Sequence, residues 1–204
     1  MGMTDPAAIA HLLWWLLGAF VFPLWLLSGL TDYICHARTD IAHTSGVRES
    51  QLHLLQTVEI GVPLLAFLFC SVDALVLVLM FAGVVAHTAS SWSDLRYADG
   101  RLRITPFEQY VHSFLNVLPW IAFALVVVLH WPVVRGVFDP AIDSDWLPRV
   151  RHPGFDGRIV FAVLSSSVLL GMLPALRELA STFRAEARAN QVSSSKARSA
   201  TNPR

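Results

Sequence analysis

Long apolar stretches separated by short polar segments form the main pattern of this chain. Five stretches have about the length of 20 residues that an α-helix needs to cross the hydrocarbon core of a bilayer. Charged side chains are absent from residues 12–30, 74–93, 113–134 and 159–176, and Glu59 is the single one in residues 54–72. The pattern therefore predicts five transmembrane helices, at about residues 8–34, 48–70, 74–96, 106–131 and 157–185.

The remaining segments differ in character. Residues 132–157 are rich in Pro, Asp and Gly, so we expect an external loop or an ordered cap there. Residues 189–204 are rich in Ser and Asn and carry basic side chains, which is typical of a disordered cytoplasmic tail. Residues 1–188 are expected to form one five-helix transmembrane domain.

The composition agrees with a membrane protein. Of the 204 residues, 54% are hydrophobic and 15% charged, and 15 basic residues balance 15 acidic ones. These values exclude a disordered chain, a nucleic-acid-binding protein with a basic surface and an ordinary soluble enzyme. With two cysteines there is no disulfide framework and no cysteine-rich metal site. Cys35 and Cys70 fall at opposite ends of their spans, so they are not expected to pair.

The distribution of basic residues predicts the orientation. Most of them lie between spans one and two, between spans three and four, or after span five. The positive-inside rule then places the N-terminus outside and the C-terminus in the cytoplasm of a cell or inner membrane. The interfacial arginines between the spans are also candidates for binding a lipid head group, although topology alone explains them: Arg38, Arg48, Arg96, Arg101 and Arg103.

Carboxylates and imidazoles recur in pairs at the predicted cytoplasmic end. Three spans contain an acidic residue four positions before a histidine, and in the third span His87 precedes Asp94 by seven. Residues four or seven apart share a helix face. The candidate metal ligands are Asp32, His36, Glu49, His53, His87, Asp94, Glu108 and His112.

The chain direction sorts these eight groups into two layers. Asp32, His53, His87 and His112 form the deeper layer, and His36, Glu49, Asp94 and Glu108 the shallower one. Imidazole and carboxylate ligands together suit Fe, Zn or Mn. Inward-facing Glu and His side chains in a four-helix bundle are typical of dinuclear sites. We therefore predict two metal ions, with iron as the first choice, in a bundle of four of the five helices.

Each ligand also has a simpler interpretation. Thr105-Pro106-Phe107-Glu108 is a capping box, and Glu49, Asp94 and Asp32 are close in sequence to the arginines 48, 96 and 38. The set as a whole could also be a polar network, a bis-histidine haem site or a transport path.

Several other polar residues are assigned by position. Glu49 and Glu59 are candidate catalytic groups, and Gln56 and Asn116 are candidates for supporting the ligands by hydrogen bonds. His43 is read as a loop residue. His11, His130 and His152 are expected at the external surface and outside the site.

The architecture resembles that of the integral-membrane di-iron hydroxylases and desaturases, which have about four spans and a histidine cluster at the cytosolic face. Their His-x-x-x-His and His-x-x-His-His boxes are not matched here, because Asp32, Glu49 and Glu108 stand where that family has histidine. In ligand type the chain is closer to soluble ferritin-like di-iron proteins. The resemblance covers about residues 30–116 and implies a dinuclear oxidative site.

The first functional hypothesis is a metal-dependent membrane oxidoreductase that acts on a lipid or other hydrophobic substrate and receives electrons from a donor protein. The second is a Zn- or Mn-dependent lipid hydrolase. A non-enzymatic haem electron-transfer protein and a metal or proton transporter are the third and fourth. No nucleic-acid partner is expected, and the oligomeric state is left open.

Overall fold

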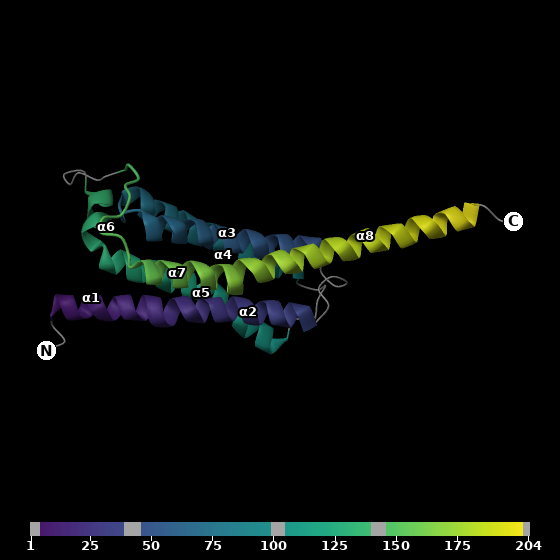
Figure 1. The fold of residues 1–204 in the computed structure, drawn as a ribbon, viewed down its shortest axis with the longest axis horizontal. Coiled ribbons are helices and arrows are strands. Elements are labelled where there is room, and N and C mark those ends of the chain that lie inside the picture. The colour runs from purple at the N-terminus through teal and green to yellow at the C-terminus, as the bar shows by residue number, and fades with distance from the viewer. Residues whose placement is uncertain (1–4, 39–45, 99–104, 140–145, 202–204) are drawn as a thin grey trace.

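Five helices that are long and apolar enough to cross a membrane make up nearly all of this computed structural model (Figure 1). The structure describes residues 5–38, 46–98, 105–139 and 146–201. The described residues form no β-strand, so the predicted all-α membrane protein is confirmed. The spanning helices are Pro6–Arg38, Gly46–Phe69, Ala74–Tyr97, Pro106–Leu129 and Gly157–Ser195.

The first and last spans each contain a π-helical segment. The first consists of α1 (Pro6–Trp15), η1 (Leu16–Val21) and α2 (Phe22–Arg38). The last consists of α7 (Gly157–Ser167), η2 (Val168–Met172) and α8 (Leu173–Thr201). Each π segment ends two residues before a proline, Pro23 or Pro174. Proline lacks an amide hydrogen and its ring clashes with the carbonyl four residues earlier, so a widened turn accommodates it inside the membrane.

The middle spans are α3 (Gly46–Phe69), α4 (Ala74–Ala98) and α5 (Pro106–Leu129). A short turn joins α3 to α4, and the Asp73 carboxylate accepts a hydrogen bond from the Val76 amide at 2.9 Å, as expected for an N-cap. The two helices approach closely at Gly83. A Cβ atom there would lie 2.5 Å from Cγ of Pro63 and 2.6 Å from the carbonyl oxygen of Glu59.

The other neighbours complete the bundle. Helix α2 packs against α5, and α8 packs against α3 and α2. Four helices, α2, α3, α4 and α5, and the first part of α8 therefore surround a common interior (Figure 1).

At the end of the bundle near the N-terminus, a small helix and an extended segment close the structure. Helix α6 (Trp131–Phe138) packs against α4. The amide of Arg151 donates to the Phe69 carbonyl at 2.9 Å, and its Nη2 atom donates to the Phe67 carbonyl at the same distance. Its guanidinium lies 4.5 Å from the ring centroid of Phe155. Burial lowers the pKa of this guanidinium. The segment predicted as a loop or cap thus lies on the α3–α4 turn.

The C-terminal segment differs from the expectation. The sequence predicts disorder from residue 189, whereas α8 continues as a helix to Thr201 and extends beyond the bundle (Figure 1). Residues 186–195 are exposed along it. The physical reason is local, because Ala, Arg, Glu and Gln are good helix formers and an existing helix is easily propagated.

Candidate metal centre

Buried carboxylates and imidazoles gather at the end of the bundle where α2 ends and α3 and α5 begin. We call this the site end. The most buried members are Asp32, His36, Glu49, Asp94, Glu108 and Glu178, whose residues are 2–7% exposed. Such groups are costly inside a membrane unless they are paired or bind a cation.

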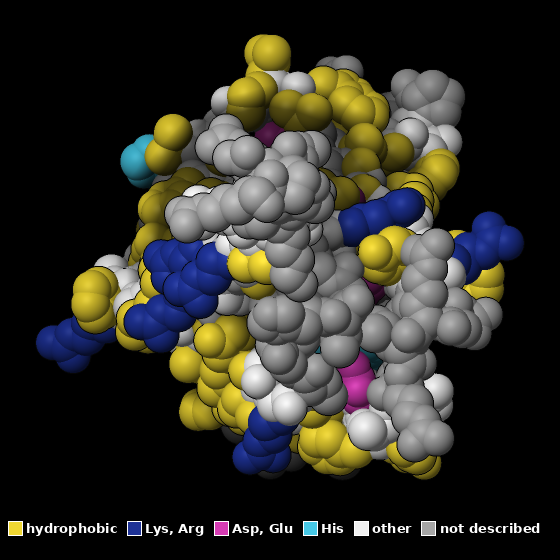
Figure 2. Space-filling model, turned by 90° about the vertical axis from the view of Figure 1, so that its right-hand side faces the viewer, with side chains coloured by type: hydrophobic (Ala, Val, Ile, Leu, Met, Phe, Trp, Pro, Cys, Tyr) yellow, Lys and Arg dark blue, Asp and Glu magenta, His cyan; other side chains and the backbone are white. Residues whose placement is uncertain are grey.

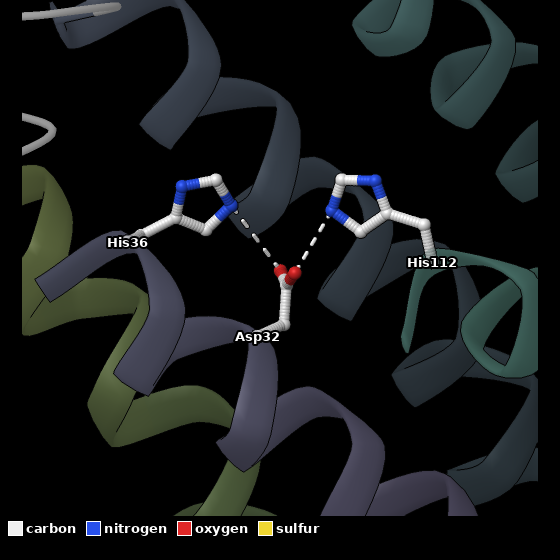
Figure 3. A group of neighbouring side chains, drawn as sticks. All are labelled: Asp32, His36 and His112. Carbon is white, nitrogen blue, oxygen red and sulfur yellow. Dashed lines mark ion pairs between the residues drawn. The ribbon is translucent and has the colours of Figure 1, made fainter. Parts of the chain in front are cut away.

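The first ligand group consists of Asp32, His36 and His112 (Figure 3). The Asp32 carboxylate lies between the two rings. Its Oδ1 atom is 2.8 Å from Nε2 of His112, and its Oδ2 atom is 3.6 Å from Nε2 of His36. Helix α2 supplies Asp32 and His36 from successive turns, and α5 supplies His112, as the four-residue spacing predicts.

The second group consists of His36, Glu49 and His53. The Nδ1 atom of His36 is 3.8 Å from Oε1 of Glu49. The rings of His36 and His53 have centroids 4.7 Å apart. In each group, one ligand atom per residue lies within 4.8 Å of the others. His36 belongs to both groups and faces them with its two different nitrogens.

His53 contacts two further carboxylates. Its Nε2 atom is 3.4 Å from Oδ2 of Asp94, and its Nδ1 atom is hydrogen-bonded to Oε1 of Glu178 at 2.8 Å. Glu178 lies on α8 and is 4% exposed. The residue spacing that predicts the other ligands does not include it, although one signal was present: Glu178 is the single acidic residue within the predicted fifth span, 157–185.

Glu108 forms the predicted capping box and also lies near His36. Its Oε2 atom accepts a hydrogen bond from the Thr105 amide at 3.3 Å, which closes the capping box. Its Oε1 atom faces Nδ1 of His36 at 4.0 Å. One oxygen stabilises the start of α5, and the other remains directed at the cluster.

The proposed arginine partners do not hold the other carboxylates. The guanidinium of Arg48 lies 4.8 Å from the ring centroid of Tyr97, and that of Arg96 lies 5.9 Å from the ring centroid of Trp92. In the described residues, Glu49 and Asp94 instead contact imidazoles. The simple ion-pair interpretation of these two carboxylates is therefore not what the structure shows.

His87, like Asp94 and Glu108, belongs to neither ligand group. Its Nε2 atom donates to the Leu115 carbonyl at 3.2 Å. His87 shares a helix face with Asp94, but seven residues place it about 10 Å further along the helix axis. The Leu115 carbonyl binds one ring nitrogen, whereas the Nδ1 atom is buried without a hydrogen-bond partner in the described residues.

The candidate catalytic residue Glu59 has a partner inside the bundle. Its Oε2 atom accepts a hydrogen bond of 2.6 Å from Ser90. The Ser90 hydroxyl also contacts the His87 carbonyl at 3.0 Å. Glu59 is thus part of the contact between α3 and α4, at the level of His87.

The two predicted supporting residues border the cluster. Asn116 donates to the His112 backbone carbonyl at 3.1 Å. Together with Gln56 it lines a small cavity whose other walls include Asp32, His53 and Asp94. The Gln56 Nε2 and Asn116 Oδ1 atoms are buried without a hydrogen-bond partner in the described part of the chain.

The ligand atoms themselves fit a cation better than a closed hydrogen-bond network. Buried Glu49 Oε2, Asp94 Oδ1 and His53 Nε2 have no hydrogen-bond partner among the described residues. Nε2 of His112 lies 2.8 Å from Asp32, yet the pair lacks hydrogen-bond geometry. Buried polar atoms rarely remain unsatisfied. Buried nitrogen and oxygen atoms that converge on one place and lack hydrogen-bond partners could serve as ligands to a metal ion.

The remaining predicted residues lie around the cluster or away from it. Arg38, Arg48 and Arg96 are exposed. Basic side chains surround the site end in Figure 2, with acidic atoms visible between them. Arg101, Arg103 and His43 lie outside the described residues. His11 accepts a hydrogen bond from Trp15 at 3.3 Å, and His130 and His152 lie toward the capped end. No disulfide joins Cys35 and Cys70, which both lie in the described residues.

The cluster thus combines three imidazoles with five carboxylates. They are His36, His53, His112, Asp32, Glu49, Asp94, Glu108 and Glu178. This donor set is suited to Fe, Mn or Zn. No known protein family, curated protein or solved structure matches this chain. Function is therefore inferred from the chemistry of the cluster.

Proposed function

We propose that this chain is a metal-dependent membrane enzyme, and that it is a dinuclear oxidoreductase of the iron type which acts on a lipid or another hydrophobic substrate. The observation that carries the proposal is the shared position of His36 in two ligand groups on α2, α3 and α5. Asp32 and His112 complete one group, and Glu49 and His53 complete the other.

Two ions suit the cluster better than one. Eight donor residues exceed the four to six that a single ion usually takes from a protein. Five buried carboxylates also accumulate negative charge, and two divalent cations would offset most of it. Dinuclear carboxylate sites in helical bundles use a similar set of Glu and His ligands.

Iron is favoured by the mixture of imidazole and carboxylate ligands and by the hydrophobic surroundings. Bound iron would supply the redox chemistry for the reduction of O2. Oxidation of a C–H bond to an alcohol would place one oxygen atom in the product and release the other as water, with two electrons and two protons from a donor protein. The chain's own residues hold the ions, and the apolar bundle keeps bulk water from the reacting centre. The resemblance to membrane hydroxylases and desaturases agrees with this chemistry.

The basic residues favour a cytoplasmic position for the site end. Arg38, Arg48 and Arg96 lie around it and are exposed, as the positive-inside rule expects of a cytoplasmic face. They are suited to hold an anionic lipid head group at the interface.

A lipid hydrolase is the second candidate. Glu49 favours it, because its Oε2 atom is buried without a hydrogen-bond partner in the described residues and is available as a general base. A Zn or Mn ion would then activate water. The rings of His36 and His53, with centroids 4.7 Å apart, leave no space for a porphyrin between them, so this pair is not suited to bind a haem from its two faces.

Metal analysis of the purified full-length chain, combined with an absorption spectrum and O2-uptake measurements in lipid vesicles, tests the proposal. We expect two iron atoms per chain, no Soret band and oxygen consumption that depends on a reductant and a lipid. One zinc with esterase activity would favour the hydrolase. A chain that takes up no metal after incubation with iron, zinc or manganese would overturn both candidates.

A further inference from the structure

A large apolar cavity occupies the interior of the bundle on the side of the capped end. Its volume is about 420 Å³. Residues from α1, η1, α2, α3, α4, α5 and α7 line it, and all of them are apolar or glycine. Representative lining residues are Trp14, Val21, Leu64, Phe67, Val126 and Phe155. A pocket of this volume with an apolar lining is typical of sites that bind apolar small molecules.

A second cavity lies beside the ligand cluster and shares one lining residue with the first. It has a volume of about 80 Å³, and its walls include Asp32, His53 and Glu178. Trp25 lines both cavities. The indole of Trp25 therefore stands at the junction between the apolar space and the ligand cluster.

The Trp25 side chain has an unused donor at this junction. Its Nε1 atom is buried and has no hydrogen-bond partner in the described part of the structure. An indole N–H is a donor only, and burying it unbonded is unfavourable. A ligand that carries an oxygen atom at this point would satisfy it.

We propose that the apolar cavity binds the hydrocarbon chain of a single-chain lipid, whose oxygen-bearing end lies at Trp25 and faces the metal centre. A methylene group occupies about the volume of a water molecule, roughly 30 Å³, so the cavity accommodates on the order of a dozen carbons. This inference deepens the proposed function and rests on it for the identity of the reacting centre. Fatty acids and fatty alcohols share the required chemistry.

The chain offers a matched pair of variants on α5. Ala122 lines the apolar cavity, whereas Ala124 is exposed and does not. We expect Ala122→Leu to weaken chain binding by at least about tenfold, because its added carbons occupy the space of the ligand's own. Ala124→Leu, with the same added volume on the same helix, is expected to bind as the unaltered protein does. Trp25→Phe keeps an aromatic side chain but removes the N–H donor, so it should weaken lipid binding while the hydrocarbon chain still occupies the cavity.

The experiment uses palmitic acid and hexadecanol, each with a photoactivatable diazirine near the terminal methyl group, in phosphatidylcholine vesicles that contain the full-length protein. We expect saturable labelling of cavity residues such as Phe67 and Val126, competed by the unlabelled compound. The stronger of the two probes identifies the oxygen function. Labelling confined to lipid-facing residues, or equal labelling in Ala122→Leu and Ala124→Leu, would overturn the inference.

Metal content, measured on the same samples, separates this inference from the proposed function. Saturable cavity labelling in a protein that takes up no metal would support the lipid-binding cavity and reject the proposed metal enzyme. Two bound metal ions without cavity labelling would reject the lipid-binding cavity and leave the proposed metal enzyme intact.

Discussion

The Nδ1 atom of His53 lies 2.8 Å from the Oε1 atom of Glu178 in a buried hydrogen bond that joins α3 to α8. This contact connects residues 125 positions apart and brings the last span into a cluster otherwise built from α2, α3, α4 and α5. A carboxylate that bonds the far nitrogen of a ligating imidazole orients the ring and increases its basicity. Glu178 can therefore set which face of His53 meets a metal ion.

Glu178→Gln should weaken metal binding by about tenfold to a hundredfold, because the carboxamide is neutral and offers a poorer acceptor to His53. Competition titration with a chelator of known affinity measures the change. Glu186→Gln is the matched control, since Glu186 lies on the same helix and is exposed. If the two variants bind metal equally well, Glu178 has no part in the centre.

His36→Ala should remove most metal binding, because His36 belongs to both ligand groups. His53→Ala and His112→Ala each affect one group, so we expect each to retain part of the metal content. The measurement is metal per chain by mass spectrometry after purification. His11→Ala removes an imidazole from α1, away from the cluster, and should leave metal content unchanged. Full metal content in His36→Ala would reject the shared position of this residue.

Metal removal should lower the thermal stability of the folded chain. A ligand present at a hundred times its dissociation constant stabilises the state that binds it by about 2.7 kcal/mol. Thermal unfolding in detergent, with and without a chelator, measures this difference. The chelator should change the thermal stability of His36→Ala very little, because this variant is expected to bind little metal. An equal chelator effect on both proteins would mean that the stabilising metal lies elsewhere.

Much of the fold and part of the centre follow from the sequence because both depend on local regularity. The apolar stretches indicate the spans directly, and the four-residue spacing in Asp32–His36 puts both side chains on one helix face. The structure places this pair in one ligand group with His112 of α5.

Contacts between helices could not be predicted in the same way, because the periodicity of one helix carries no information on how it packs against another. His87 shares a face with Asp94, but the packing of α5 places the Leu115 carbonyl against its ring. Glu178 was missed because the position of α8 beside α3 depends on tertiary packing and not on the pattern of the last span. The π segments before Pro23 and Pro174 likewise depend on how each proline is accommodated.

Gly83→Ala should destabilise the bundle by about 1–3 kcal/mol, the usual effect of overpacking. The added Cβ atom would lie 2.5 Å from Pro63 and 2.6 Å from the Glu59 carbonyl, and backbone cannot move aside cheaply. Gly61→Ala is the control, because nothing lies within 4 Å of a Cβ atom there. Thermal unfolding of both variants in the same detergent compares them. A Gly83→Ala variant as stable as Gly61→Ala would show that α3 and α4 are further apart.

The Asp32–His112 pair distinguishes a metal centre from a polar network. Their facing atoms are 2.8 Å apart without hydrogen-bond geometry, as expected of two ligands that meet at one ion. Asp32→Asn and His112→Gln, alone and together, form a double-mutant cycle in which both metal affinity and unfolding free energy are measured. If both residues bind the same ion, each single variant should lose most of the affinity and the double variant little more.

A network without a metal gives the opposite pattern in this cycle. The coupling between Asp32 and His112 would then appear in the unfolding free energy of the metal-free protein, with a size of about 0.5–3 kcal/mol, and metal affinity would be low and equal in all four proteins. Ser113→Ala is the control variant on α5, because Ser113 is exposed and its hydroxyl donates to the Gln109 carbonyl in its own helix. We expect the coupling to appear in metal affinity. The buried carboxylates at the site end repel one another, and a bound cation offsets their charge.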